Sequence, residues 1–490
     1  MRLPPRSLHA LNSALTLRPP PAPCAVDTLR RINREPFLDQ VTAKKEWRGG
    51  AHLVTLVLLS LVAGAAVGFV ASLFRLSLEW AEARRVLVIA WAQGVPIWGV
   101  VAVVGGCALA AALAAWMVER FSPDSAGSGI PHVESVLQHD VPIATWHLIP
   151  VKFVGGLLAI GSGLALGREG PSVQMGATIA HEVGRRLNWK TEDCRSLLAA
   201  GAGAGLATAF NAPIGGSVFV LEELVRRFDT RIAIVTFGAS TGAIIVARLL
   251  LGAAPEFAVA GVVEPALVAM PAFLLLGIVM GLLGVFYNRL LLALLGIADS
   301  FRHAPRWANA AMVGVAVGLL GYFWPLAVGG GDAITRAALH MPEARVTGVV
   351  QSGTVIGTLA LLFAIRFVLG PLSYAAQTPG GLFAPLLAVG AQAGVLCAFG
   401  WNMCAANVFP GAAVDPAAMG IVAMVGLFAA VVRAPLTGIV LVSEMTVGMT
   451  LLLPMIGVCV GAMLVPTMMG NEPIYESLKL RAVRMAGAKR

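Results

Sequence analysis

Residues 167–177 have the sequence Gly-Arg-Glu-Gly-Pro-Ser-Val-Gln-Met-Gly-Ala and lie within a long, mostly apolar part of the chain. A carboxylate at the depth of a bilayer costs about 3 kcal/mol or more, so Glu169 needs a cavity, a partner or a function. Gly167 and Gly170 permit a sharp backbone turn, and Pro171 suits the first turn of a helix. The stretch therefore predicts a helix whose N-terminus points into the protein.

A helix N-terminus offers unpaired amide donors and a partial positive charge, which together form an anion site. Glu169 lies where such an anion would bind. A side chain that competes with an anion for these donors, and that can be protonated, is a gate linked to pH. The alternative is a structural ion pair between Glu169 and Arg168 at the end of the helix.

The composition indicates a polytopic integral membrane protein. The 490 residues are 58% hydrophobic and 12% charged, with a mean hydropathy of +0.81, whereas soluble domains carry about 25% charged residues. This composition excludes a soluble binding module. The six cysteines form no C-x-x-C pair, so neither a disulfide framework nor a metal site is expected.

The net charge of +9 comes mainly from the two ends of the chain. Nine Arg or Lys residues lie in the first fifty positions, and others crowd the tail: Lys479, Arg481, Arg484, Lys489 and Arg490. Basic flanks stay on the cytoplasmic side of a membrane, so both termini are expected there. No basic patch with regularly interleaved aromatic residues accompanies these ends, so no nucleic-acid partner is expected.

Residues 1–49 form a basic segment that contains consecutive prolines, interpreted as a disordered cytoplasmic lead-in with a short amphipathic helix over 27–47. An organelle transit peptide is the alternative. Apolar stretches long enough to span a bilayer follow. They are 52–74, 97–118, 232–251, 266–295 and 451–469, and a further apolar run covers 146–166.

Two other apolar segments, 196–208 and 214–221, are too short to span a bilayer. Short segments interrupted by Gly and Pro predict discontinuous helices that meet near the midplane, as in transporters. The second ends at Glu222 and Glu223. Three arginines follow and place this end on the cytoplasmic side, namely Arg226, Arg227 and Arg231.

An internal duplication divides the chain into repeats over 50–255 and 262–470. The first match runs from Ala212-Pro213-Ile214-x-Gly216 with Glu222, at an offset of 222, to Ala434-Pro435-Leu436-x-Gly438 with Glu444. The second runs from Gly167, Pro171, Gly176 and Ala177, at an offset of 214, to Gly381, Pro385, Gly390 and Ala391. The residues alone leave open whether the repeats are parallel or inverted.

Three further positions have both a functional and a structural interpretation. Ser128, in Gly-Ser-Gly-Ile-Pro at 127–131, offers a hydroxyl beside free amides or is an ordinary N-cap. The duplication places Phe383, in 380–385, at the same cavity as Glu169, although it could simply be a packed aromatic. Tyr475 could donate to an anion or lie in an interfacial aromatic belt.

These motifs resemble those of the CLC chloride channel and transporter family. They are Gly-Ser-Gly-Ile-Pro at 127–131, Gly-Arg-Glu-Gly-Pro at 167–171 and Gly-Leu-Phe-Ala-Pro at 381–385, followed by a tyrosine after the last span. The resemblance extends from about residue 50 to Tyr475 and is strongest to bacterial proton-coupled chloride exchangers. It implies an all-α polytopic fold, an inverted repeat with many tilted and discontinuous helices. It also implies a homodimer with one pore per subunit.

The resemblance also implies roles for individual residues. Anions would be held by the Ser128 and Tyr475 hydroxyls and by backbone amides near Leu382 and Phe383. Glu169 would be the outer gate and proton acceptor. Glu223 would be the inner proton-transfer site, although at helical spacing it could instead pair with Arg226 or Arg227. The selectivity-filter residues would be Gly127, Ser128, Gly129, Ile130, Pro131, Gly167, Arg168, Glu169, Gly170, Pro171, Gly381, Leu382, Phe383, Ala384 and Pro385.

The expected function is therefore exchange of chloride for protons across the inner (plasma) membrane, with the lipid bilayer as the other partner and no cofactor. A passive chloride channel of the same fold is the alternative, disfavoured because Glu169 and Glu223 are both present. The short basic tail, 471–490, carries Tyr475, and no nucleotide-sensing CBS domains of the kind found in eukaryotic members are expected. His132 departs from the glutamate of many members. Its neighbour Glu134 could pair with Lys152.

No enzyme is expected. His181-Glu182-Val183-Gly184 begins a zinc-protease motif, but Arg185 stands where the second histidine ligand belongs. An intramembrane serine protease, which would need a nucleophile and a base in register, is not expected either.

Overall fold

The structure is a computed structural model that describes residues 50–259, 262, 264–301, 305–340, 352–404, 411–446 and 448–487. The predicted N-terminal segment, 1–49, and its helix over 27–47 lie outside the described residues. Within them the chain is helical, and its extended pairing is confined to two isolated bridges. Glu169 and the motifs around it all lie in the described part.

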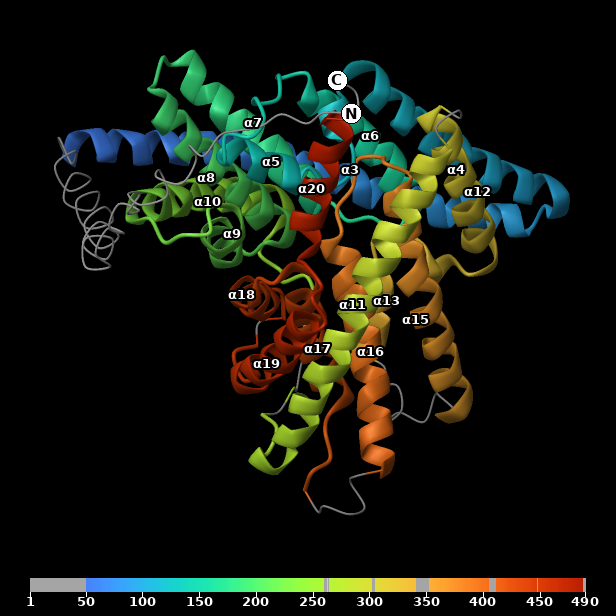
Figure 1. The fold of residues 1–490 in the computed structure, drawn as a ribbon. Helices are drawn as coiled ribbons and strands as arrows, with labels where there is room; N and C mark the ends of the chain where they lie inside the picture. The colour runs from blue at the N-terminus through green and yellow to red at the C-terminus, as the bar shows by residue number, and fades with distance from the viewer. Residues whose placement is uncertain are drawn as a thin grey trace, which may run out of the picture. The chain divides into compact units, whose positions relative to one another are not determined.

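The helices follow one another in two series that the figures label in chain order (Figure 1). The first series is α3 (Gly50–Gln93), α4 (Pro96–Phe121), α5 (Ile130–Leu137), α6 (Leu148–Gly161), α7 (Glu169–Arg186), α8 (Thr191–Phe210), α9 (Pro213–Phe219) and α10 (Thr230–Leu251). The second is α11 (Met270–Ser300), α12 (Arg306–Phe323), α13 (Asp332–Leu339), α15 (Ser352–Ala375), α16 (Phe383–Cys404), α17 (Pro416–Val432), α18 (Pro435–Thr446) and α19 (Leu452–Met468). Helix α20 (Ile474–Gly487) follows.

Helix α3 is much longer than the predicted span over 52–74, with 44 residues that end at Gln93. Hydropathy falls after Phe74 because charged residues begin there. These residues pair at helical spacing, Arg75 with Glu79 at 2.9 Å and Glu82 with Arg85 at 3.2 Å, and so support the helix instead of ending it.

The two segments predicted to be too short to span differ in outcome. Helix α8 has 20 residues, not the thirteen of 196–208, because its first turn is polar and carries Glu192 and Asp193, which favour a helix N-terminus. Helix α9 is short, as predicted, and continues as a single π-helical turn over Val220–Leu224 that contains Glu223.

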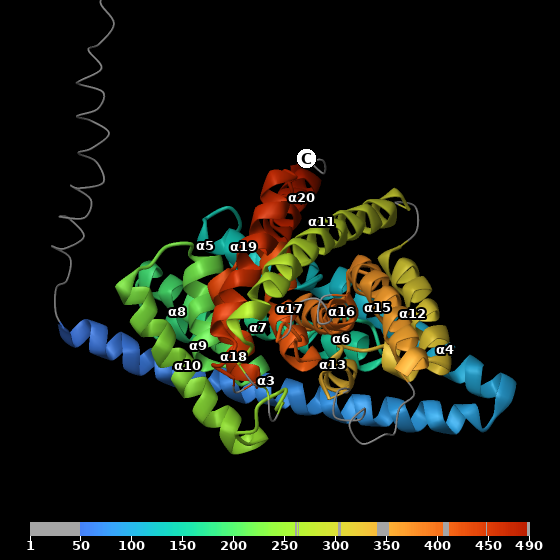
Figure 2. The ribbon, with the colours of Figure 1, turned by 90° about the horizontal axis from the view of Figure 1, so that it is seen from below.

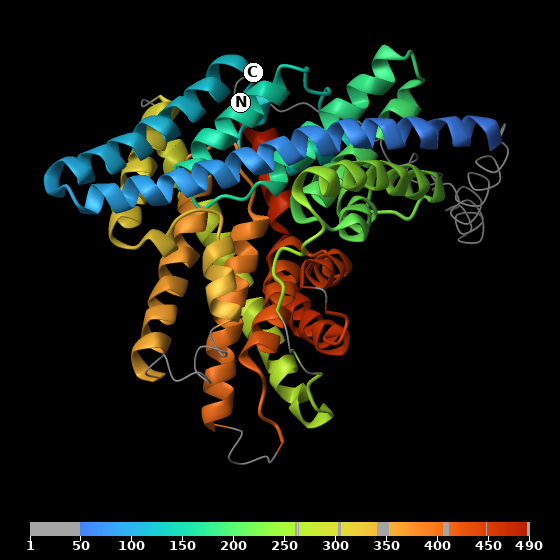
Figure 3. The ribbon, with the colours of Figure 1, turned by 180° about the vertical axis from the view of Figure 1, so that it is seen from behind.

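The duplicated motifs begin equivalent helices. Helices α7 and α16 begin at Glu169 and Phe383, while α9 and α18 begin at Pro213 and Pro435. Proline fits these first turns because it needs no amide hydrogen there. From the point where their N-termini meet, α7 and α16 run toward opposite ends of the helical part (Figures 1 and 3). The two repeats are therefore inverted.

Small residues let the helices behind these N-termini pack closely. A Cβ atom on Gly176 of α7 would lie 2.3 Å from the carbonyl oxygen of Gly201 in α8. At the equivalent contact of the second repeat, a Cβ atom on Gly390 would lie 2.9 Å from the Ala423 carbonyl. Glycine at both positions allows the backbones to approach, as in other membrane helix pairs.

Six helices of the described chain are long and apolar enough to cross a bilayer: Gly50–Gln93, Ile97–Phe121, Thr230–Leu251, Leu267–Ser300, Val355–Ala375 and Phe383–Cys404. Large apolar side chains on several of them are exposed, such as Ile97 at 77% and Leu249 at 80%. Helices α4 and α12 pack side by side far from α10 (Figure 2). The protein is thus a multi-pass membrane protein whose apolar outer surface suits lipid.

Candidate functional site

The three glycine-rich motifs meet at the N-termini of α5, α7 and α16. Gly127 donates to the Thr378 carbonyl at 3.1 Å and accepts from the Gly380 amide at 3.0 Å. Gly167 and Gly381 exchange backbone hydrogen bonds of 2.9 and 2.7 Å. Three stretches that are far apart in sequence are therefore joined into one backbone frame.

Glu169 lies at the centre of this frame and is fully buried. Its Oε1 accepts hydrogen bonds from the amides of Phe383 at 2.6 Å and Ala384 at 3.3 Å. A Cβ atom on Gly167 or Gly381 would lie 2.1 or 2.3 Å from a carboxylate oxygen of Glu169, so only glycine leaves room for this side chain. The carboxylate thus occupies donors at the N-terminus of α16, the type of site that binds anions.

Arg168 pairs with residues other than Glu169. This disfavours the alternative in which Glu169 and Arg168 form a structural ion pair. Its Nη2 lies 2.9 Å from Glu256 Oε2, and its Nη1 lies 3.5 Å from Asp332 Oδ2. Its Nε donates to the Ala209 carbonyl at 3.1 Å. The guanidinium is therefore satisfied without the Glu169 carboxylate.

Ser128, Tyr475 and Phe383 converge beside Glu169. A Cβ atom on Gly170 would lie 2.5 Å from Ser128 Oγ, so the hydroxyl lies directly against the first turn of α7. The rings of Phe383 and Tyr475 have centroids 6.0 Å apart. Within the described residues neither the Ser128 hydroxyl nor the Tyr475 hydroxyl forms a hydrogen bond of ordinary geometry. The two buried hydroxyls lie near each other and have no further partner among the described residues, so beside a helix N-terminus they suit an anion.

Helix α20 brings Tyr475 into the core, where its side chain is fully buried, so the interfacial-belt interpretation is wrong. The helix is held by charged residues: Lys479 lies 3.1 Å from Asp140, and Arg481 pairs with Asp299. The two predicted backbone donors sit beside it. Leu382 precedes α16 and Phe383 begins it, and both are buried.

Glu223 lies in the π-helical turn after α9 and is 4% exposed. Its Oε1 is 3.7 Å from Arg226 Nη2, so the predicted pairing with Arg226 is present but long. The same arginine lies closer to two other carboxylates, at 3.2 Å from Glu134 and 3.0 Å from Glu476. Glu223 therefore shares one cation with two other acids, and its own carboxylate is the least tightly held.

Lys152 does not pair with Glu134, contrary to the prediction. Its Nζ donates to the carbonyls of Ser125 at 3.0 Å and Gly127 at 2.7 Å, and the side chain is fully buried. Glu134 is taken by Arg226 instead. Lys152 thus fixes the turn that presents Ser128. Its position inside an apolar helix was the sequence signal for a structural role.

Tyr374 is a site residue that the sequence analysis missed. Its hydroxyl accepts a hydrogen bond from the Ser128 amide at 3.3 Å, and its side chain is 7% exposed. It lies in the last turn of the apolar helix α15 and belongs to no motif, so nothing in the sequence distinguished it. His132, where many family members have glutamate, is only partly exposed.

Among the described residues, no three His, Cys, Asp or Glu side chains come together as metal ligands. Glu182 of the incomplete zinc motif pairs with Arg185 and Arg186 at 2.7 and 2.8 Å. These contacts give it a structural role at the exposed end of α7.

Fold and site together define a polytopic, all-helical membrane protein built from an inverted repeat around a buried carboxylate. The chain belongs to the voltage gated chloride channel family, whose model matches residues 110–467. It is 36% identical over 453 residues to the H+/Cl− exchange transporter ClcA of Vibrio parahaemolyticus, covering 89% of this chain and 91% of the relative. It is 35% identical to the ClcA of Yersinia pseudotuberculosis, covering 87% and 88%.

Solved structures show the same fold. A slow cyanobacterial Cl−/H+ antiporter superposes with a TM-score of 0.80 at 32% identity, covering 88% of this chain and 98% of that one. A eukaryotic CLC transporter superposes with a TM-score of 0.72 at 23% identity, covering 88% and 74%. The fold class predicted from the sequence motifs is confirmed.

Proposed function

We propose that this protein exchanges chloride for protons across the membrane. The observation that carries the proposal is the hydrogen bond from the Phe383 amide to Glu169 Oε1, in which a protonatable group occupies an anion's donors. When Glu169 is charged, it excludes an anion from this position. When Glu169 is protonated, its hydrogen bonds to these amides weaken, and the side chain can leave. Relatives named as H+/Cl− exchange transporters support this proposal.

We propose that the permeating chloride binds next to this position, between the hydroxyls of Ser128 and Tyr475 and the amides near Leu382 and Phe383. Both hydroxyls are buried and face each other, and neither has a further hydrogen-bond partner among the described residues, which supports a ligand there. The Lys152 amine donates to the Gly127 carbonyl at 2.7 Å and so holds the turn from which Ser128 is presented.

Glu223 is proposed as the inner proton-transfer site. A carboxylate at 4% exposure with a cation at 3.7 Å is placed to accept and release protons without being locked into a tight ion pair. A passive chloride channel of the same fold remains the alternative function. It would need no second buried acid, so the presence of Glu223 favours exchange.

We propose that the protein is a homodimer with one pore per subunit, assembled through α9, α10, α18 and α19, which gather on one side (Figures 1 and 3). Apolar side chains exposed on these helices support this face: Ile214, Phe237, Leu249, Leu436, Ile456 and Val460. We also propose that the protein lies in the inner membrane with both termini in the cytoplasm. The proposed repeats are residues 50–255 and 262–470.

The experiment uses purified protein in chloride-loaded liposomes, with external chloride and pH recorded together. A chloride gradient should drive protons in the opposite direction against their own gradient. Chloride movement with no pH change, while the membrane potential is clamped, would replace the exchanger with the channel. Absence of chloride movement by well-folded protein would end both proposals.

A further inference from the structure

The carboxylate of Glu256, which lies next to Arg168, binds three arginines. Glu256 belongs to the segment between α10 and α11, and its side chain is 2% exposed. Its Oε2 lies 2.9 Å from both Arg75 of α3 and Arg168 beside the gate. Its Oε1 lies 3.2 Å from Arg336 of α13. A single acid therefore joins three elements from both repeats.

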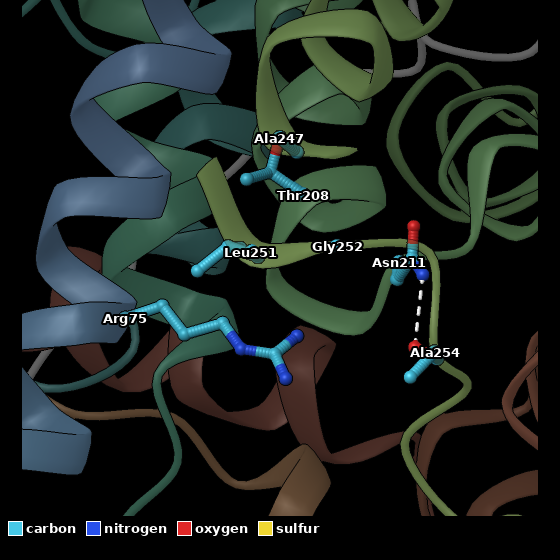
Figure 4. Close-up of a pocket in the computed structure, with 7 residues that line it drawn as sticks. All are labelled: Arg75, Thr208, Asn211, Ala247, Leu251, Gly252 and Ala254. Carbon is cyan, nitrogen blue, oxygen red and sulfur yellow. Dashed lines mark hydrogen bonds between the residues drawn. The ribbon is translucent and has the colours of Figure 1, made fainter. Parts of the chain in front are cut away.

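The segment that carries Glu256 is fixed on both sides of it. Asn211 donates to the Ala254 carbonyl at 3.1 Å, and Arg75 extends from α3 toward the same segment (Figure 4). On the other side, the Phe257 amide donates to the Met445 carbonyl at 2.9 Å. The carboxylate is thus held in place before any anion arrives.

Glu256 stays charged in this environment. Burial alone raises the pKa of its carboxyl, but Arg168, Arg75 and Arg336 outweigh burial and hold that pKa below its ordinary value. The negative charge next to Arg168 is therefore present throughout the pH range in which Glu169 would titrate.

We propose that Glu256 is a positioning residue for the gate, which fixes and neutralises Arg168 and thereby sets the pH at which Glu169 opens the pore. The inference rests on the proposed function, because it assumes that Glu169 is the gate. Glu169 is faced by the Phe383 and Ala384 amides and by Arg168, Tyr287 and Tyr475. Arg168 in turn is faced by Glu256, Asp332 and Glu79, with Glu82 and Arg85 lining the same pocket.

The sign of the effect follows from charge. In Glu256→Gln, one negative charge is lost beside Arg168, so the surroundings of Glu169 become more positive. A more positive environment favours the carboxylate over the acid. Glu169 then stays charged, and the pore closed, down to a lower pH. The midpoint of the pH profile of chloride flux should move to lower pH by about 0.5 to 1 unit, the size expected for one nearby, partly screened charge.

The test measures chloride efflux from liposomes between acid and neutral pH for the wild type, Glu256→Gln, Glu256→Asp and Glu182→Gln. Glu182 is the control, because it also pairs with arginines, Arg185 at 2.7 Å and Arg186 at 2.8 Å, but lies near the C-terminal end of α7, away from Arg168. The midpoint should fall for Glu256→Gln, and stay near the wild-type value for Glu256→Asp, which keeps the charge, and for Glu182→Gln. A folded Glu256→Gln protein with the wild-type midpoint would overturn the inference.

Arg336 provides a second variant, which keeps the Glu256 carboxylate and its contacts with Arg75 and Arg168, and its own side chain is 54% exposed. Arg336→Gln should move the midpoint to higher pH, because Glu256 then acts more strongly on Arg168. An unchanged midpoint in folded Arg336→Gln protein would also overturn the inference, even if Glu256→Gln fails to fold. A wild type without pH-dependent chloride flux would instead refute the proposed function itself.

Discussion

Glu222 and Glu444 each bind the helix N-terminus of the opposite repeat. Glu222 accepts from the amides of Leu436 at 3.0 Å and Thr437 at 2.7 Å, in the first turn of α18. Glu444 accepts from the amides of Ile214 at 3.1 Å and Gly215 at 2.7 Å, in the first turn of α9. The two carboxylates are equivalent residues of the duplication, and their exchange ties the repeats together.

Loss of either carboxylate should therefore destabilise the protein. Glu444→Ala leaves two amides of α9 without their acceptor, and removal of such a cap costs about 0.5 to 2 kcal/mol. The melting temperature in detergent should fall by about 0.5 to 2 °C, since the entropy of unfolding of a chain of this length converts 1 kcal/mol to about 1 °C. Glu119→Ala, at an exposed position in the last turn of α4, is the control and should melt like the wild type. Equal melting of all three proteins would show that the cap contributes nothing measurable.

These caps illustrate how much of the fold the sequence could predict. The duplication, the starts of α9 and α18 and the meeting of α7 with α16 followed from glycine and proline positions. Those residues impose local backbone geometry wherever they occur. The inverted orientation could not be derived from them, because it depends on how many times the chain crosses the membrane. The length of α3 was also missed, because its charged second half is stabilised by side-chain pairs that hydropathy ignores.

The sequence predicted the site residues that lie in motifs, but not those that act through distant partners. Glu169, Ser128 and Phe383 lie in motifs whose chemistry is local, and the structure brings them together with Tyr475. Lys152, Tyr374 and Glu256 were missed or misassigned, because each acts through a partner far away in sequence. Lys152 binds carbonyls 25 and 27 positions earlier, and Tyr374 binds an amide 246 positions earlier. A single sequence carries no record of such contacts.

Ser128 should contribute to anion choice. Ser128→Ala removes the hydroxyl donor and keeps the backbone amide that donates to Tyr374 at 3.3 Å. Chloride is smaller and more strongly hydrated than nitrate and depends more on each donor, so the ratio of chloride to nitrate flux should fall. Ser128→Pro should have at least the same effect, since it removes both donors. The measurement is the ratio of chloride to nitrate flux in liposomes. A ratio unchanged in both variants would make Ser128 only a helix cap.

Glu223 should be needed for proton coupling and not for chloride movement. In Glu223→Gln, Arg226 keeps Glu134 at 3.2 Å and Glu476 at 3.0 Å, so no buried cation is left without a partner. The variant should fold, carry chloride and fail to drive protons uphill. Glu476→Gln removes another partner of the same arginine, at 29% exposure, and should keep the coupling. Normal coupling in Glu223→Gln would assign Glu223 a structural role with Arg226.

Glu169→Gln separates a gate from an ion pair most directly. A glutamine cannot carry charge, so it imitates the protonated carboxyl at every pH. If Glu169 is the gate, chloride should pass across a wide pH range, with no pH dependence and no uphill proton movement. If the residue were needed to pair with Arg168, the change would strand a buried cation, at a cost of about 3 to 5 kcal/mol.

The contacts of Arg168 predict which of these outcomes to expect. Its guanidinium is already bound by Glu256 at 2.9 Å and approached by Asp332 at 3.5 Å, so neutralising Glu169 leaves it paired. Glu169→Gln should therefore elute as a single symmetric peak in gel filtration and melt close to the wild type. Flux and coupling are then measured on that same preparation in liposomes. Misfolded protein, or folded protein that retains wild-type coupling, would rule out Glu169 as the proton-linked gate.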